Sequence, residues 1–235
     1  MDWFLNKRQN FCASVSIGWK SRSNSFYGNA EITSNAVCLF IQNTPVKRRI
    51  FFAIELPQVL QSQLTHYTTA GQSQVPSFKW VSSPNFHLTL KFLGNVNDEI
   101  LHKAKSTLEH EIRELNPFNL TVSHLGAFPA WQHAKVIWLG VEDQKRTCAQ
   151  IKSVIETSFY QTHCVSQAEK DYTPHITLAR LKNKSLSKTR DFPPLPDDLS
   201  GIVILVDRVT CFESRLEPKG PLYQSLFKLS LKSDW

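Results

Sequence analysis

The chain has 235 residues, of which 41% are apolar and 11% aromatic, so it can bury a sizeable core and is not a wholly disordered protein. Its formal net charge of +7 favours phosphate-bearing partners only mildly, and its five cysteines, odd in number and without Cys-x-x-Cys spacing, argue against a disulfide framework or a zinc site. No apolar run approaches the roughly 20 residues of a membrane span, so we expect a cytoplasmic protein with reduced thiols and no membrane contact.

Residues 1–46 are rich in serine and asparagine, and their aromatic residues follow neither a helical nor a strand period. We interpret them as a poorly ordered leader. In a bacterial gene, Val46 could instead be a GTG start codon, so that the protein would begin at VKRRIFFAIELP; a transit peptide is a third interpretation. Regular patterns begin after this segment, and we predict a single domain over residues 47–235.

The sequence of the first half of that domain predicts alternating strands and helices. A buried strand, RRIFFAIEL, ends at Pro57, and proline is favoured where a helix starts. A later segment has apolar residues at spacings of three and four, which predicts a helix that begins at Asn97 or Asp98. The expected order is a strand from 49, a helix over 57–68, a strand over 86–93, a helix from 97 or 98, and a strand over 118–125.

The sequence of the second half predicts a similar order of elements. It consists of a strand over 135–141, a helix over 144–160, a strand at His175, a proline-rich connection over 186–201, and strands over 202–214 and 222–232. Strands outnumber helices and short turns often join them, which predicts an α+β fold of antiparallel sheet with helices packed on one side.

The order of elements indicates an internal duplication. When FFAIEL at 51 is set against VIWLGV at 136, His87 and His175 fall at closely similar distances downstream. The period is too long for a solenoid repeat, so we predict two related lobes that face each other.

The segment FHLTLKFLG at 86–94 raises the question of function. Its apolar residues occupy every second position and end at Phe92, so the pattern predicts a strand with one buried face. His87 and Thr89 lie between them and therefore share the other face.

The segment PHITLAR at 174–180 repeats this arrangement with His175 and Thr177. One His-x-Thr on a strand is common by chance, but two copies at matching positions of a duplicated unit favour a joint function. If the two strands meet in a cleft between lobes, two imidazoles face one another, each beside a hydroxyl donor.

A pair of imidazoles suits proton transfer. Imidazole has an ordinary pKa of about 6.5, so near neutrality one ring can accept a proton while the other donates one. This general base and general acid fit an in-line displacement at phosphorus, and the hydroxyls can donate to non-bridging phosphate oxygens. The predicted catalytic residues are His87, His175, Thr89 and Thr177, and the chemistry needs neither a metal ion nor a cofactor.

These residues resemble the 2H phosphoesterases, and within them the bacterial RNA 2',3'-cyclic phosphodiesterases once called 2'-5' RNA ligases (the LigT-like group). The matching stretches, in the family's order over residues 47–232, are RRIFFAIELP, FHLTLKFLG, LGAFP, VIWLGV, PHITLAR and SRLEPKGPLY. The resemblance implies a bilobal fold of two pseudo-symmetric lobes of antiparallel sheet, with helices packed on the outside and an active-site groove between the lobes. It also implies hydrolysis of a terminal 2',3'-cyclic phosphate on RNA to a 2'-phosphomonoester. The expected partners are RNA ends or nucleotides that carry this group, and we expect a monomer.

The resemblance also implies roles for single residues. His87 would donate a proton to the departing 3' oxygen and His175 would activate water, although exchanged roles, which would yield a 3'-phosphate, remain open. Arg180, five residues after the second histidine, is carried over as a substrate-binding residue. Strand alternation places Arg180 on the buried side, so either the strand ends or bulges after Leu178, or Arg180 forms a structural ion pair. In the strand predicted over 118–125, His124 shares a side with Phe118, Leu120 and Val122. Alternation therefore predicts that His124 is buried.

Three other activities remain open. Ligation of RNA through a 2',5' linkage and hydrolysis of small cyclic nucleotide phosphates would use the same catalytic residues. Binding of RNA ends without catalysis is the third, and intact His and Thr at all four motif positions argue against it.

Overall fold

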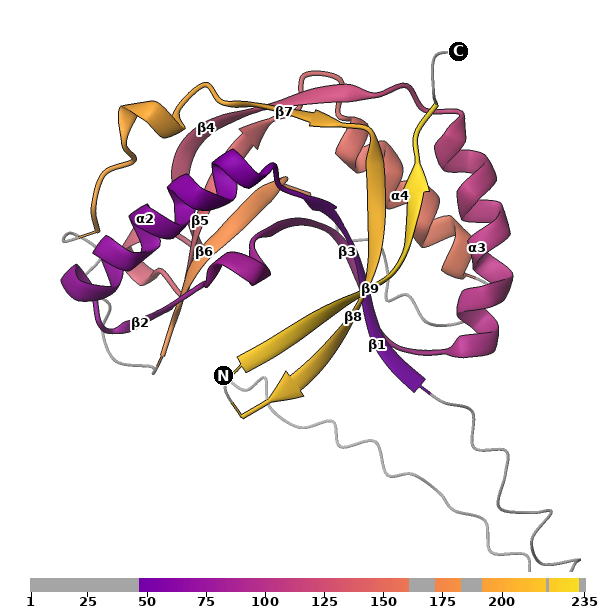
Figure 1. Cartoon of the computed structure of the whole chain (residues 1–235), viewed down its shortest axis with the longest axis horizontal. Coiled ribbons are helices and arrows are strands. Elements are labelled where there is room, and N and C mark those ends of the chain that lie inside the picture. Colours follow the sequence, from indigo (N-terminus) through magenta and orange to yellow (C-terminus); the bar gives the residue numbers. More distant parts are fainter. Residues whose placement is uncertain (1–46, 161–171, 183–191, 219, 233–235) are drawn as a thin grey trace, which may run out of the picture. The chain divides into compact units, whose positions relative to one another are not determined.

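A computed structural model describes residues 47–160, 172–182, 192–218 and 220–232 (Figure 1). The leader expected over residues 1–46 and the first part of the proline-rich connection lie outside the described residues. None of the described helices is long and apolar enough to cross a membrane.

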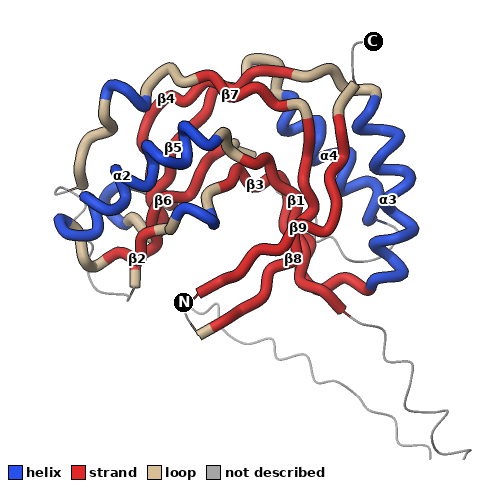
Figure 2. Tube along the Cα trace, viewed as in Figure 1, coloured by secondary structure: helices blue, strands red, loops and turns tan. Residues whose placement is uncertain are grey.

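The described strands form one antiparallel sheet of nine strands (Figure 2). Along the sheet the order is β7 (Val203–Val206), β4 (Phe118–Phe128), β5 (Val136–Glu142), β6 (His175–Leu181), β3 (His87–Asn97), β1 (Lys47–Glu55), β8 (Arg208–Glu217) and β9 (Gly220–Ser230). The short strand β2 (Phe78–Trp80), which the sequence patterns do not predict, pairs with the end of β6. The predicted α+β class with antiparallel sheet is confirmed.

The order of the strands is symmetric about the contact between β6 and β3. Strands β6, β5, β4 and β7 form one half, and β3, β1, β8 and β9 form the other. The registered contact between β3 and β6 is a single residue pair, Leu88 with Ile176. Each of these two central strands begins at the histidine of a His-x-Thr motif, so the predicted arrangement of two related lobes is confirmed.

Three α-helices are described: α2 (Gln58–Gln74), α3 (Asp98–Arg113) and α4 (Thr147–Tyr160). Helix α2 follows Pro57 as expected but runs beyond the predicted end at 68. Helix α3 has the predicted apolar stripe, with buried residues at intervals of three and four. These residues are Leu101, Ala104, Leu108 and Ile112.

The helices of the two repeats are exchanged between the halves of the sheet. Helix α4 connects β5 to β6, yet it packs against β3 and α3 of the other half. Helix α2 lies between β1 and β3 in the chain, yet it packs against β2, which is paired with β6. Figure 1 shows α3 and α4 together on one side of the molecule and α2 on the other side.

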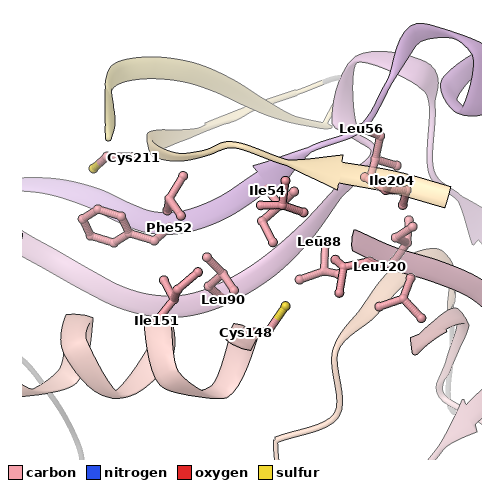
Figure 3. Packing of buried hydrophobic residues seen from close by; sticks show 14 of the residues in the cluster. Phe52, Ile54, Leu56, Leu88, Leu90, Leu120, Cys148, Ile151, Ile204 and Cys211 are labelled. Carbon is pink, nitrogen blue, oxygen red and sulfur yellow. The ribbon is translucent and has the colours of Figure 1, made fainter. Parts of the chain in front are cut away.

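One hydrophobic core runs through both halves (Figure 3). Phe52 of β1 and Leu88 of β3 belong to the same cluster as Leu120 of β4, Ile151 of α4 and Ile204 of β7, and all five are buried. Burying a side chain of this size contributes about 1.5–3 kcal/mol. The helices cover this face of the sheet, which leaves the opposite face for a site.

The single strand predicted over 202–214 is wrong, because the segment forms β7 in one half of the sheet and β8 in the other. The break falls at Asp207, whose carbonyl accepts a hydrogen bond from Leu231 N at 2.9 Å and whose carboxylate pairs with Arg208 at 2.7 Å. Both pieces are rich in β-branched residues, so local preference does not reveal that they pair with different strands.

Candidate active site

The register of β3 and β6 brings the two His-x-Thr motifs together. Leu88 and Ile176 are paired and fully buried, so the residues on either side of them point to the opposite face of the sheet. In an antiparallel pair of strands, this register sets each histidine across from the threonine of the other motif. The facing pairs are His87 with Thr177 and Thr89 with His175. The two histidines are then diagonal neighbours, a relationship that separates backbone positions by about 7–8 Å.

A groove of about 540 Å³ opens on this face. His87, Thr89, Thr177 and Arg180 line it. His175 is not a lining residue, but it lies close enough for its charge to lower the pKa of His87. The structure therefore brings the five predicted residues to one side of the sheet. In the described part of the chain, no three His, Cys, Asp or Glu side chains gather closely enough to hold a metal ion.

The two imidazoles are held in the same way. His87 Nδ1 lies 2.8 Å from the carbonyl oxygen of Asn85, and His175 Nδ1 lies 2.7 Å from that of Thr173. A carbonyl oxygen can only accept, so Nδ1 carries a proton in both rings. The Nε2 atom of each ring makes no hydrogen bond to a described residue, so it is available to a ligand.

Both histidines are neutral at pH 7 in the free protein. The pKa of His87 is lowered to about 4: burial is the largest cause, the hydrogen bond to Asn85 opposes it, and the nearby charges of Arg180 and His175 add to it. The pKa of His175 is also below its ordinary value, first because of burial and then because of Arg180, against the hydrogen bond to Thr173. With Nδ1 protonated, each neutral ring presents Nε2 as a proton acceptor.

Aromatic rings pack against both histidines, and this packing accounts for their burial. The His87 ring lies 4.9 Å from Phe51 and 5.2 Å from Tyr223, measured between ring centroids. In the other half of the sheet, the His175 ring lies 5.1 Å from Phe128 and 5.8 Å from Trp138. Since the rings are packed on their faces and edges, their orientation is fixed before a ligand arrives.

Arg180 reaches the groove because β6 bulges. Ile137 and Trp138 of β5 are neighbours, but they pair with Ala179 and Thr177, so Leu178 is an extra residue in β6. Leu178 and Ala179 are both buried as a result, and Arg180 is exposed in the groove. Arg180 makes no ion pair with a described carboxylate. The structure therefore favours a bulge, which falls at Leu178, over the structural ion pair.

Phe92 occupies the matching position in the other half. Phe52 and Ala53 are neighbours in β1 but pair with Lys91 and Thr89, so β3 bulges at Leu90 as β6 bulges at Leu178. The expectation of a buried Phe92 is wrong for this reason. Its side chain is 48% exposed and lines the groove. The signal in the sequence is its place five residues after the first histidine, which is the place of Arg180 after the second.

Two contacts with other parts of the chain hold β3 in place. Tyr172, three residues before His175, donates a hydrogen bond from its hydroxyl to the carbonyl oxygen of Thr89 at 2.9 Å. On the core side, the ammonium groups of Lys91 and Lys152 both contact Oε1 of Glu156, at 2.7 and 2.8 Å. The first contact ties the first motif to the segment that carries the second, and the second contact ties β3 to α4. No sequence period predicts either of them.

His124 is exposed, so the expectation that it is buried is wrong. The pairing of β4 with β5 shifts between Val122 and Leu125, and this irregularity changes the side to which His124 points. Its ring lies 5.6 Å from Trp138, which also contacts His175, but His124 does not line the groove.

Comparisons with known proteins identify the family and agree with this fold. The sequence model of the 2'-5' RNA ligase superfamily matches residues 57–214. The RNA 2',3'-cyclic phosphodiesterase of Thermotoga maritima is 31% identical over 185 residues, which cover 77% of the chain and 94% of the relative.

Solved structures show the same fold. A protein of Thermus thermophilus superposes with a TM-score of 0.68 at 26% identity, over 80% of the chain and 100% of that protein. Escherichia coli LigT in complex with 3'-AMP superposes with a TM-score of 0.65 at 28% identity, also over 80% and 100%. The chain therefore belongs to the 2'-5' RNA ligase superfamily, the 2H phosphoesterases that its two His-x-Thr motifs resemble.

Proposed function

We propose that the chain hydrolyses a 2',3'-cyclic phosphate at the 3' end of RNA and leaves a 2'-phosphomonoester. The observation that carries this proposal is the antiparallel facing of the two motifs, with the Nε2 atoms of His87 and His175 free of hydrogen bonds to described residues. The name of the Thermotoga maritima relative and the nucleotide bound to Escherichia coli LigT support the substrate class.

The displacement uses the two histidines on opposite sides of phosphorus. His175 Nε2 takes a proton from water as the water oxygen bonds to phosphorus. The bond from phosphorus to the 3' oxygen breaks, and His87 Nε2 supplies a proton to that oxygen. The products are a free 3' hydroxyl and a 2'-phosphomonoester, and no step requires a metal ion.

The other groove residues bind the substrate. Thr89 and Thr177 donate hydrogen bonds to the non-bridging oxygens, whose negative charge grows as water attacks. Arg180 lies close enough to lower the pKa of both histidines, so its guanidinium can contact the same phosphate. The exposed ring of Phe92 offers a flat face on which the terminal base can stack.

The lowered pKa values determine when the site becomes active. An acid at the leaving oxygen must hold a proton on Nε2, whereas both rings are neutral at pH 7 in the free protein. A bound phosphodiester is negatively charged and stabilises an imidazolium beside it. Substrate binding therefore raises the pKa of His87 and charges the acid.

The test uses an oligoribonucleotide that ends in a 2',3'-cyclic phosphate, incubated with the purified protein in EDTA. We expect conversion to a 2'-phosphate end, identified by its mass and by the resistance of that end to enzymes that require a 3'-phosphate. His87→Ala and His175→Ala should each lower kcat by about 100- to 10,000-fold, since each removes one proton-transfer group.

Each other outcome rejects a stated part of the proposal. Loss of activity in EDTA would reject the metal-free mechanism, and a 3'-phosphate product would exchange the roles of the two histidines. Joined RNA strands with a 2',5' linkage would identify a ligase. Binding without turnover would identify a module that only recognises RNA ends.

A further inference from the structure

The groove extends beyond the histidines along β2 and the end of β6, and this extension is cationic. Lys79 of β2 pairs with Arg180 of β6, so the two residues are directly opposite on adjacent strands. Lys182 follows Arg180 by two residues. All three side chains are exposed and line the groove.

These positive charges lack acidic partners. Glu217 is the one carboxylate among the described residues that line the groove, and none of the three cations makes an ion pair with a described carboxylate. Two positive charges directly opposite on neighbouring strands destabilise a sheet. Their presence together is thus not explained by the stability of the fold, and it is explained by an anionic ligand.

The lysines are held at the rim of the groove. Lys182 Nζ donates a hydrogen bond to the carbonyl oxygen of Pro76 at 2.8 Å, and an ammonium group has two further protons to donate. Lys79 Nζ lies 3.8 Å from the place where a Cβ on Gly220 would be, so it spans to the β8–β9 hairpin on the facing wall.

The spacing fits a chain of phosphates. Arg180 lies at the histidines, whose pKa values it lowers. Strand geometry places the backbone of Lys79 about 4.8 Å from that of Arg180, and the backbone of Lys182 about 6.6 Å from it. The first offset runs across the sheet and the second along the chain, but both lysines lie beyond Thr177 on the Arg180 side of the second motif. The next phosphate of an RNA strand that leaves the histidines toward Arg180 would meet them there.

We propose that Lys79 and Lys182 form a second anion subsite, which binds the phosphate on the 5' side of the terminal nucleotide. The site then takes oligoribonucleotides of at least two residues in preference to mononucleotides. This inference rests on the proposed function, because the terminal cyclic phosphate occupies the first subsite at the histidines.

The experiment compares two substrates that differ by one internucleotide phosphate and one nucleoside. These are uridine 2',3'-cyclic phosphate and the dinucleotide UpU that ends in a 2',3'-cyclic phosphate. For Lys79→Gln and for Lys182→Gln, we expect the ratio of kcat/KM on the dinucleotide to that on the mononucleotide to fall by about tenfold, the loss typical of one charge-assisted contact. Lys145→Gln is the matched control, because Lys145 is equally charged and exposed but does not line the groove.

Salt dependence gives a second readout. The logarithm of kcat/KM on the dinucleotide falls with the logarithm of the salt concentration, and each phosphate contact on a single strand contributes a slope of about −0.7. Lys79→Gln and Lys182→Gln should each flatten the slope by about this amount, whereas Lys145→Gln should leave it near that of the wild type.

Equal losses on both substrates would overturn the proposal, as would ratios that match those of Lys145→Gln. If the wild-type protein hydrolyses neither substrate, the proposed function fails but the subsite is still tested. In that case, titration with UpU 2'-phosphate and uridine 2'-phosphate decides: tighter binding of the dinucleotide that both lysine variants abolish supports the subsite, and equal binding rejects it.

Discussion

Leu88 and Ile176 face each other where the two halves of the sheet meet, and they are the one pair that the described parts of β3 and β6 share. Because both side chains enter the core, the motifs around them are exposed together on the other face. Each histidine thus lies across from a threonine that belongs to the other repeat. This arrangement of the two motifs exists only where the two repeats meet.

The threonines should contribute to catalysis across this junction. Thr89→Val and Thr177→Val remove a hydroxyl but keep the branched shape of the side chain. We expect each to lower kcat by about 100-fold with little change in KM, since a donor to the developing charge acts mainly in the transition state. Serine at either position should restore most of the rate. Steady-state kinetics on a cyclic-phosphate dinucleotide measures the effect, and a loss below about twofold would remove the threonines from the mechanism.

The pH dependence should differ between the free and the bound protein. The profile of kcat/KM reports the free protein, in which His87 has a pKa of about 4 and His175 a pKa below the ordinary value. His87, the proposed acid, loses its proton as the pH rises through its pKa. We therefore expect a maximum of kcat/KM below pH 6.5 and a fall of about tenfold per pH unit above it. The profile of kcat should lie at higher pH, because the bound phosphate stabilises the imidazolium.

NMR titration of the imidazole Cε1 protons checks the same values directly. The resonance that disappears in His87→Asn should titrate near pH 4 in the free protein and at higher pH when uridine 2'-phosphate is bound. A His87 resonance that titrates at about pH 6.5 or above in the free protein, the range of an unperturbed imidazole, would contradict the burial of this ring.

Phe92 and Arg180 should affect different parts of the substrate, although they occupy matching positions. Stacking on an aromatic ring is worth about 1–3 kcal/mol per base, so Phe92→Ala should lower kcat/KM by about 5- to 150-fold and Phe92→Trp should restore it. On ribose 2',3'-cyclic phosphate, which has no base, the loss should vanish. Arg180→Ala should impair both substrates, because its partner is the phosphate. Equal losses for Phe92→Ala on both substrates would assign the ring to packing instead.

The stability of the protein should depend on Glu156, which neutralises the buried ammonium groups of Lys91 and Lys152. Glu156→Gln leaves the ammonium groups of Lys91 and Lys152 buried without a countercharge, and loss of one partner in such a cluster costs about 3–5 kcal/mol. Chemical denaturation measures this free energy of unfolding. The matched control is Glu99→Gln, which breaks an exposed pair with Lys103 and should change the stability little. A similarly small change for Glu156→Gln would show that water reaches the cluster.

The sequence predicts those parts of the site that depend on local periodicity. His87 and Thr89 share a face because residues two apart on a strand always do, provided that the strand is regular between them. The helix over Asp98–Arg113 follows from its own apolar stripe in the same way. The near-identical offsets of the two motifs indicate the duplication, and the sheet order confirms it.

The parts that local periodicity misses depend on neighbouring strands. Alternation buries Phe92 and Arg180, whereas bulges at Leu90 and Leu178 expose both in the groove. A bulge exists only relative to the partner strand, so β3 or β6 alone does not reveal it. The cationic pair of Lys79 and Arg180 has the same origin, since sequence patterns do not predict β2, and its pairing with β6 joins residues far apart in the chain.

The exchange of α2 and α4 between the halves means that neither repeat can fold as a module of its own. Each half of the sheet packs against a helix from the other repeat, so the shared interior is complete only when both repeats are folded. In the proposed function, the RNA end therefore meets a groove built by both repeats, with Lys79 and Lys182 exposed at its rim.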